Sequence, residues 1–227
     1  MEHALGVLTR LADSLPYRWQ NELKRIYYSR QILKGTFASP EPEYSMLPQL
    51  VRPGDWVMDI GANVGHYSRR FSELVGDSGR VIAFEPVPTT FALLAANVQR
   101  FAHANVTLLN AAVSDKTESV GISVPQASAG RKNYYQAHLS PAGESDLAVL
   151  SISVDALGID RRIALIKIDV EGHEAFVVRG MQQLLRRSRP FLVIETSSKE
   201  VTAELSALGY SAEKVVDSPN VLFRPRE

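Results

Sequence analysis

A short segment bounded by Gly61 and Gly65 constrains this chain more than any other part of its sequence. It follows residues 55–60, an apolar run that predicts a strand, and it leads into residues 64–75, whose apolar positions repeat at helical spacing. Glycine has no Cβ, so the backbone can turn sharply here and a ligand can approach it closely. The following helix offers free N–H groups and the positive end of its dipole. The segment therefore predicts a strand, a tight turn and a helix, with a bound ligand or close packing at the turn.

Strand-like and helix-like stretches alternate along most of the chain, a pattern typical of a parallel sheet with crossover helices. Further strands are predicted at 80–84, 106–109, 163–168 and 191–194, and further helices at 91–101, 176–185 and 201–208. A final hairpin is predicted at 210–216 and 221–224. We therefore expect an α/β fold with helices on both faces of a mostly parallel sheet.

Two stretches depart from this alternation. Residues 115–150 are rich in Ser, Gly, Pro, Gln and Ala and contain alternating apolar positions, which predict an antiparallel β excursion. Residues 1–35 predict two helices that are split near Pro16 and carry an excess of Lys and Arg. A basic helix can bind a membrane surface or an acidic partner, but we favour a solvated face on a capping element. The expected organisation is an N-terminal helical cap over 1–42 and one domain over 43–227.

Composition excludes several classes of protein. The 227 residues include no Cys, which removes disulfides, thiolate nucleophiles, zinc–thiolate sites and iron–sulfur clusters. The 25 Lys and Arg residues balance the 25 Asp and Glu residues, which argues against a nucleic-acid-binding protein. No apolar run approaches the ~18 residues of a membrane span, and the N-terminus lacks the pattern of a secretory signal. We expect a cytoplasmic protein, and the sequence predicts no oligomeric state.

The second predicted strand is followed directly by an acid, Glu85. In a strand–turn–helix unit, an acid at this place accepts hydrogen bonds from ribose hydroxyls, so a nucleoside cofactor is indicated. The spacing Gly61-x-Asn63-x-Gly65 differs from the G-x-G-x-x-G spacing of NAD sites. Asp59 also places a carboxylate beside the turn, which would repel a pyrophosphate and suit an ammonium or sulfonium group. An NAD-dependent oxidoreductase on a similar fold is therefore the weaker alternative.

Three blocks stand in order between Glu43 and Phe191: Asp59-Ile60-Gly61-Ala62-Asn63-Val64-Gly65, Phe84-Glu85-Pro86-Val87-Pro88 and Lys167-Ile168-Asp169-Val170-Glu171-Gly172-His173-Glu174. Together they resemble the FkbM family of S-adenosylmethionine-dependent methyltransferases. The resemblance implies a Rossmann-like class I methyltransferase fold, with a seven-stranded, mostly parallel sheet and an antiparallel C-terminal strand. It also implies S-adenosyl-L-methionine as the cofactor, bound at the carboxyl ends of the strands.

The resemblance assigns cofactor-binding roles residue by residue. The glycine turn would cradle the methionine part of the cofactor, Glu85 would bind its ribose, and Pro86 and Val87 would line the adenine pocket. Asn110 stands where many relatives carry an acid. The expected cofactor-binding residues are Asp59, Gly61, Ala62, Asn63, Gly65, His66, Glu85, Pro86, Val87, Asn110, Ala111, Ala112 and Asp169.

Catalysis is expected where the strand 163–168 ends. Methyl transfer to a hydroxyl needs donor and acceptor held in line, and a base that takes the proton. Asp169 is the first choice for a polar group beside the transferring methyl, and Glu171 is the second. Lys167 is a charge inside an apolar strand, so it needs a carboxylate partner, or it helps to activate a hydroxyl as in ribose 2′-O-methyltransferases.

The proton-accepting group is left open by the sequence. His173 and His66 are candidates because imidazole titrates near neutrality, and Glu195 is another because it ends the next strand at the same edge. No metal site is expected, because no Asp-Asn pair follows the strand 163–168.

On the resemblance, the expected function is an O-methyltransferase that moves a methyl group from S-adenosylmethionine to a hydroxyl oxygen of a small molecule. A sugar, a glycoside or a polyketide-like natural product is the expected class of acceptor. A ribose 2′-O-methyltransferase that acts on nucleic acid is the alternative suggested by Lys167 with Asp169, and the zero net charge opposes it.

Overall fold

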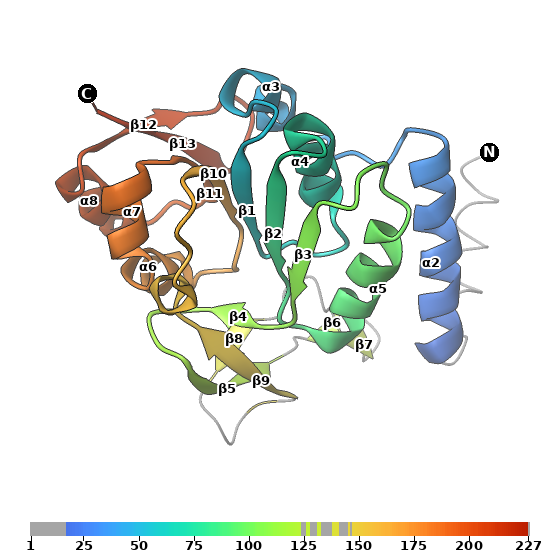
Figure 1. Ribbon diagram of the computed structural model, residues 1–227. Coiled ribbons are helices and arrows are strands. Elements are labelled where there is room, and N and C mark those ends of the chain that lie inside the picture. The colour runs from blue at the N-terminus through green and yellow to red at the C-terminus, as the bar shows by residue number, and fades with distance from the viewer. Residues whose placement is uncertain are drawn as a thin grey trace.

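A seven-stranded sheet forms the centre of the molecule, with the strand order β12-β13-β11-β10-β1-β2-β3 (Figure 1). The computed structural model describes residues 17–123, 126–127, 131–132, 138–140, 145 and 147–226. Strand β13 is antiparallel to both of its neighbours, and the other neighbouring strands pair in parallel. The expected mostly parallel sheet with an antiparallel C-terminal strand is therefore confirmed. The strands are β1 (Trp56–Ile60), β2 (Arg80–Phe84), β3 (Val106–Leu109), β10 (Ile163–Ile168), β11 (Phe191–Glu195), β12 (Tyr210–Lys214) and β13 (Asn220–Pro225).

Helices cover both faces of this sheet, as expected, and apolar side chains that alternate along each strand pack against them. On one face, β1 and β2 contact α3 (Leu47–Leu50), α4 (His66–Val75) and α5 (Pro88–Val98). On the other face, the sheet packs against α6 (Glu174–Arg179), α7 (Gln182–Ser188) and α8 (Lys199–Ala207). Because both faces are covered, every residue of β10 is buried, including Lys167.

One helix had been predicted over 176–185, and that prediction is wrong. The segment forms α6 and α7, which are separated at Gly180 and Met181. A Cβ on Gly180 would lie 1.9 Å from the carbonyl oxygen of Ser114, so the chain ends α6 where it meets a distant loop. The break therefore depends on a contact with a distant residue, which the periodicity of the apolar positions does not reveal.

A second, smaller sheet follows β3 and has the order β4-β9-β5-β8. It lies below the main sheet in Figure 1. Ile122 and Val149 of this sheet pack on Val87 and Ala112. Its strands are β4 (Ala112–Val113), β5 (Glu118–Ser123), β8 (His138–Ser140) and β9 (Leu147–Ile152); β6 (Gln126–Ala127) and β7 (Arg131–Lys132) form a separate pair.

At the N-terminal end, α2 (Tyr17–Leu33) packs on α5. Its residues Tyr28 and Ile32 form a buried cluster with Phe37, Val64 and Leu93, which joins the helix to the glycine turn. The helix predicted before Pro16 lies outside the described residues. Two short 3-10 helices, η1 (Pro42–Ser45) and η3 (Val154–Leu157), complete the described elements. None of the helices in the described ranges is long and apolar enough to cross a membrane.

Candidate functional site

The glycine turn after β1 lies against the end of β10, at the point where the strand order reverses. Gly61 adopts a φ of +81°, and a Cβ at this residue would lie 1.8 Å from the carbonyl oxygen of Asp169. The backbone N–H groups of Gly61 and Ala62 donate to Phe84 O, and Asp169 N donates to Ile60 O. Three strand ends are therefore joined by backbone contacts, and only glycine fits at their centre. In open α/β sheets, ligands bind in the crevice at such a reversal.

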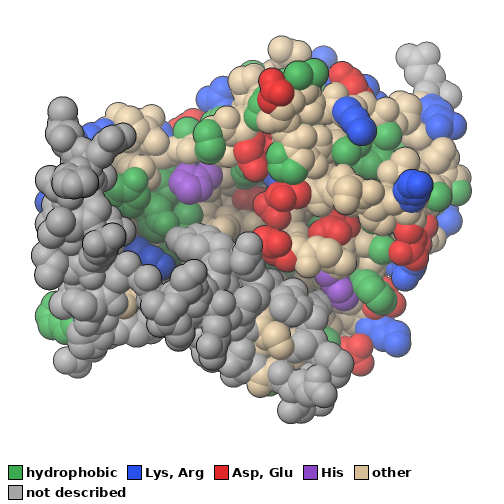
Figure 2. All heavy atoms as spheres, turned by 180° about the vertical axis from the view of Figure 1, so that it is seen from behind, with side chains coloured by type: hydrophobic (Ala, Val, Ile, Leu, Met, Phe, Trp, Pro, Cys, Tyr) green, Lys and Arg blue, Asp and Glu red, His purple; other side chains and the backbone are tan. Residues whose placement is uncertain are grey.

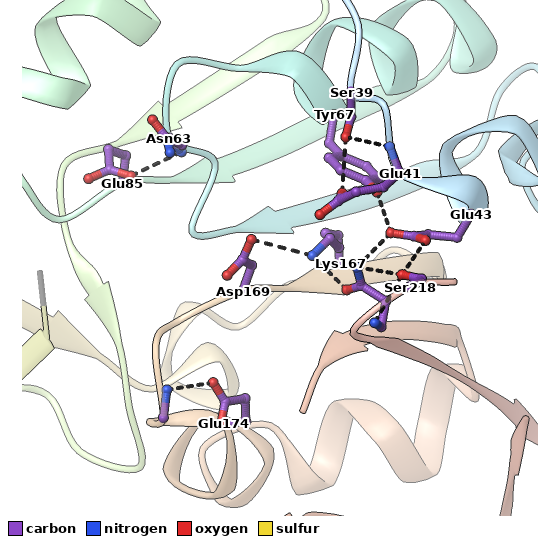
Figure 3. Close-up of polar contacts among 12 residues, drawn as sticks. Ser39, Glu41, Glu43, Asn63, Tyr67, Glu85, Lys167, Asp169, Glu174 and Ser218 are labelled. Carbon is purple, nitrogen blue, oxygen red and sulfur yellow. Dashed lines mark hydrogen bonds and ion pairs between the residues drawn. The ribbon is translucent and has the colours of Figure 1, made fainter. Parts of the chain in front are cut away.

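Glu85 is buried beside this turn, with 6% of its surface exposed. Its Oε2 accepts a hydrogen bond from Asn63 N at 3.0 Å (Figure 3). Its Oε1 accepts one from Val87 N at 2.9 Å. Burial raises the pKa of Glu85 to about 7, and the carboxylates of Asp59 and Asp169 add to the effect. Each carboxylate oxygen keeps a lone pair for a further donor.

An inner cavity, defined by the residues below, opens next to Glu85. Of the predicted residues, Gly61, Asn63, Glu85, Pro86, Val87, Ala111, Ala112 and Asp169 line it, together with Glu171 and His173. Its remaining walls are Ile60, Phe84, Thr90, Val113, Ile122 and Val170. Asn110 is not among the lining residues; its Nδ2 donates to Glu85 O and Pro86 O and so fixes the loop after β2.

A side cavity of about 140 Å³ lies on the other side of the glycine turn. Its walls are Ser39, Glu41, Asp59, Gly61, Ala62, Asn63, His66, Tyr67, Lys167 and Asp169. The predicted residue Gly65 does not line this cavity. It has a φ of +98° and forms the N-cap of α4. The Oδ1 of Asn63 is buried and, within the described part of the chain, has no hydrogen-bond partner.

Two titratable groups of the side cavity are shifted by burial. Asp59 is almost fully buried and accepts a short hydrogen bond from Ser68 Oγ, and burial raises the pKa of Asp59 to about 6. His66 packs against Phe37, with ring centroids 4.2 Å apart, and burial lowers the pKa of His66. The charged groups of this cavity are therefore Lys167 and the carboxylates of Glu41, Asp59 and Asp169.

Lys167 is 1% exposed and lies at the centre of a buried polar network (Figure 3). Its Nζ lies 3.5 Å from Asp169 Oδ2 and donates to Asn220 Oδ1 at 3.0 Å. It also lies 5.1 Å from the ring centroid of Tyr67. The sequence-based expectation that Lys167 needs a carboxylate partner is thus met by Asp169.

The network continues to the segment that precedes β1. Glu43 Oε1 accepts hydrogen bonds from Asn220 Nδ2 at 2.6 Å and from Tyr67 Oη at 2.7 Å, and Glu43 Oε2 accepts one from Ser218 Oγ at 2.7 Å. Tyr67 Oη also lies 2.6 Å from Glu41 Oε2. Glu41, Glu43, Tyr67 and Asn220 are not among the predicted site residues. The signals in the sequence are the acidic Glu41-Pro42-Glu43 run and, far along the chain, a lysine inside an apolar strand.

An outer groove of about 500 Å³ shares lining residues with both cavities. Asp169 lines the inner cavity, the side cavity and the outer groove, and Glu171 lines the first and the last. The groove is bordered by Asp169, Glu171, Gly172, Glu174, Ala175, Phe176, Glu195, Thr196, Ser197, Ser198, Glu200, Val201 and Pro219. Figure 2 shows acidic side chains gathered near the middle of the face opposite to that of Figure 1.

The predicted catalytic residues take different places around this junction. Glu171 is exposed and adopts a φ of +51°, which for a residue with a Cβ is a strained conformation. His173 forms the N-cap of α6, stacks on Phe176, and places Nε2 2.9 Å from Ser114 Oγ. Burial lowers the pKa of His173. His173 and His66 line the inner and side cavities, but neither borders the outer groove.

Within the described ranges, no group of three or more His, Asp or Glu side chains is placed to hold a metal ion.

Comparison with solved structures shows the fold. A methyltransferase FkbM from Methylobacillus flagellatus KT matches with a TM-score of 0.54 and 16% identity, covering 90% of this chain and 59% of that one. A SAM-dependent O-methyltransferase from Thermotoga maritima matches with a TM-score of 0.52 and 12% identity, covering 88% and 72% of the two chains. Both likenesses show a class I methyltransferase fold.

Comparison with curated proteins finds similar methyltransferases. The hexuronic acid methyltransferase AglP of Haloferax volcanii is 29% identical over 166 residues, which make up 70% of this chain and 64% of that protein. The 31-O-demethyl-FK506 methyltransferase FkbM of Streptomyces tacrolimicus is 48% identical over 50 residues, 22% of this chain and 19% of that protein. The chain thus spans less than two thirds of these relatives.

The family model described as the methyltransferase FkbM domain matches residues 59–212, from the acid beside the glycine turn to β12. This match contains all three sequence blocks and every wall of the inner cavity. The chain therefore belongs to the FkbM family of methyltransferases, whose methyl donor is S-adenosyl-L-methionine.

Proposed function

We propose that this chain transfers a methyl group from S-adenosylmethionine to a hydroxyl oxygen of a small molecule. The observation that carries the proposal is the position of Asp169, which lines the inner cavity, the side cavity and the outer groove. A two-substrate transfer needs one point where donor and acceptor meet, and Asp169 marks such a point.

The inner and side cavities fit the two ends of the cofactor. Glu85 has lone pairs available for the ribose hydroxyls, and the apolar walls from Val87 and Ile122 suit an adenine ring. Asn63 Oδ1, which has no partner among the described residues, is buried beside the turn and would accept a hydrogen bond from the cofactor. In the side cavity, Lys167 and Glu41 carry opposite charges, which suits the zwitterionic end of an amino acid.

The bound cofactor supplies an activated methyl group on a sulfonium sulfur. The chain's own task is then to hold the acceptor oxygen in line with that methyl and to receive the hydroxyl proton. Asp169, with its charge balanced by Lys167 at 3.5 Å, would orient the acceptor hydroxyl. Such positioning can contribute roughly 7–11 kcal/mol to the lowering of a barrier.

The class of acceptor is proposed from the relatives. One relative is named for a hexuronic acid and another for 31-O-demethyl-FK506, and we propose a sugar, a glycoside or a polyketide-like compound as the acceptor. We further propose that residues 1–42 act as a cap and that residues 115–150 help to shape the site within a domain over 43–227. Ser39 and Glu41 line the side cavity and Ile122 lines the inner cavity, which supports this proposal.

A ribosomal RNA large subunit methyltransferase E of Methanothermobacter thermautotrophicus is 36% identical over 73 residues, 30% of this chain and 34% of that protein. Together with the Lys167–Asp169 ion pair, this likeness makes a ribose hydroxyl of RNA the second acceptor to test. The alternative of an NAD-dependent oxidoreductase is overturned by membership of the FkbM family.

The test is calorimetric titration of the purified chain with S-adenosylmethionine, S-adenosylhomocysteine and NAD⁺. We expect saturable binding of the two sulfur ligands and none of NAD⁺, with the affinity reduced at least tenfold in Glu85→Ala because a charged acceptor is lost. Glu213→Ala, which removes an exposed acid paired with Arg224, is the matched control. Binding of NAD⁺ alone would refute the proposal.

The acceptor is then sought by following S-adenosylhomocysteine formation with a hexuronide, a neutral glycoside, a polyketide that has a free ring hydroxyl and a short RNA. Methylation of one of the small molecules supports the proposal. Methylation of the RNA alone, with activity that falls steeply as salt is raised, would instead favour a ribose 2′-O-methyltransferase that acts on RNA.

A further inference from the structure

With the cofactor in the inner and side cavities, as proposed above, the outer groove is left for the acceptor, so the group that takes the acceptor proton must border this groove. A general base has to lie within hydrogen-bond reach of the proton that it removes, or one water away. This condition removes His66 and His173, which do not border the groove, and it removes Glu41, which borders only the side cavity. The carboxylates of the groove remain.

Most of these carboxylates already have partners. Glu174 is buried at the start of α6 and accepts a hydrogen bond from Gly172 N at 2.8 Å. Glu200 forms a short ion pair with Arg179, and Asp169 lies 3.5 Å from Lys167 Nζ. Each of these three side chains is thus already held by another group of the protein.

Glu195 differs from the others. It is the last residue of β11, it is partly buried, and within the described ranges it makes no side-chain hydrogen bond or ion pair. Its strand lies next to β10 in the sheet, which brings Glu195 to the same edge as Asp169. Glu171 also borders the groove, but its side chain is exposed on the loop after β10.

We infer that Glu195 is the general base of the proposed methyl transfer. The inference rests on the proposed function. The acceptor oxygen forms a bond to the methyl carbon, the carbon–sulfur bond breaks with its electron pair going to sulfur, and the hydroxyl proton moves to the Glu195 carboxylate. The products are the methyl ether, S-adenosylhomocysteine and a protonated Glu195, which returns its proton to water.

The surrounding charges favour this role. Burial raises the pKa of Glu195 to about 7, with the carboxylates of Asp169, Glu171 and Glu41 adding to the effect and Lys167 opposing it. Glu200 of α8 and Glu174 of α6 are the other charged groups that border the groove. A carboxylate with a pKa near neutrality accepts a proton more readily than an ordinary one and is still ionised in part at pH 7.

The first test compares S-adenosylmethionine with S-adenosylhomocysteine, which differ only in the methyl and its positive charge. If Glu195 faces the methyl, its ionised form favours the sulfonium ligand. The ratio of the two affinities should then rise on the order of fivefold between pH 5.5 and pH 8.5 in the wild type. It should rise much less in Glu195→Gln, while Glu213→Gln, which changes an exposed acid paired with Arg224, should behave as the wild type does.

The second test uses the acceptor found by the screen described above. Glu195→Gln should lower kcat by about 10²- to 10⁴-fold with little change in cofactor affinity. If the wild type binds cofactor but methylates no compound of the screen, the affinity ratio alone decides. An unchanged ratio in Glu195→Gln, or a ratio that flattens in Glu171→Gln instead, would overturn the assignment. If neither sulfur ligand binds the wild type, the proposed function itself fails, and the role of Glu195 with it.

Discussion

Gly61 has no room for a side chain. Gly61→Ala places a methyl group 1.8 Å from Asp169 O, so either the turn or the end of β10 has to move. We expect a loss of about 3 kcal/mol or more in the free energy of unfolding, together with loss of cofactor binding. Circular dichroism melting and calorimetry measure the two effects.

Gly158→Ala is the matched control for this substitution. Gly158 also has a positive φ, of +60°, but no heavy atom lies within 4 Å of an added Cβ. The expected loss in the free energy of unfolding comes from backbone strain alone and is roughly 1–2 kcal/mol. Equal decreases in melting temperature for the two variants would show that steric contact with Asp169 is unimportant.

Glu85 should make cofactor binding dependent on pH. The ionised carboxylate accepts hydrogen bonds from ribose hydroxyls, and burial raises the pKa of Glu85 to about 7. Affinity for S-adenosylhomocysteine should therefore weaken as pH falls from 8 to 6, because a proton has to be removed before the ligand binds. Glu85→Gln, titrated over the same range, should show weaker binding with a flatter pH profile; parallel profiles would contradict the assignment.

At the level of elements, Tyr67 of α4 connects η1 to the sheet. Tyr67→Phe removes the hydroxyl that lies 2.7 Å from the buried carboxylate of Glu43, which then loses one of its donors. We expect a loss of about 1–3 kcal/mol in stability. Tyr44→Phe is the control, because its hydroxyl makes a longer bond, of 3.3 Å, to His66 O. Chemical denaturation measures both, and an equal loss would count against the network.

The elements that form the site were predictable where their signals are local. The strands at 80–84 and 163–168 and the glycine turn are visible in the sequence because apolar runs, glycine and strand-end acids lie within a few residues of each other. Glu43 and Asn220 are 177 residues apart, and no local pattern pairs them. The break between α6 and α7 was missed for the same reason, since it depends on the approach of Ser114 to Gly180.

At the level of the whole molecule, buried acids make stability depend on pH. Burial raises the pKa of Asp59 from 3.8 to about 6, so the folded chain holds this proton more tightly than the unfolded chain does. The contribution of Asp59 is therefore fully present below about pH 4 and is lost as pH rises through 6, by an amount on the order of 3 kcal/mol.

Asp59→Asn isolates this contribution, because asparagine keeps an oxygen that accepts from Ser68 Oγ and does not titrate. The melting temperature of the wild type, relative to that of Asp59→Asn, should fall between pH 4.5 and pH 7.5. A difference that stays constant over this range would contradict the shift.

The contact between Gly61 and Asp169 has a consequence for how acceptor specificity can change. The turn after β1 and the end of β10 touch through their backbones. A substitution at either place should therefore alter the binding of the methyl donor and of the acceptor together. Thr196, Ser197, Ser198 and Glu200 border the outer groove and neither of the two cavities. A library of variants at these positions should thus yield enzymes with new acceptors and the parental affinity for the methyl donor.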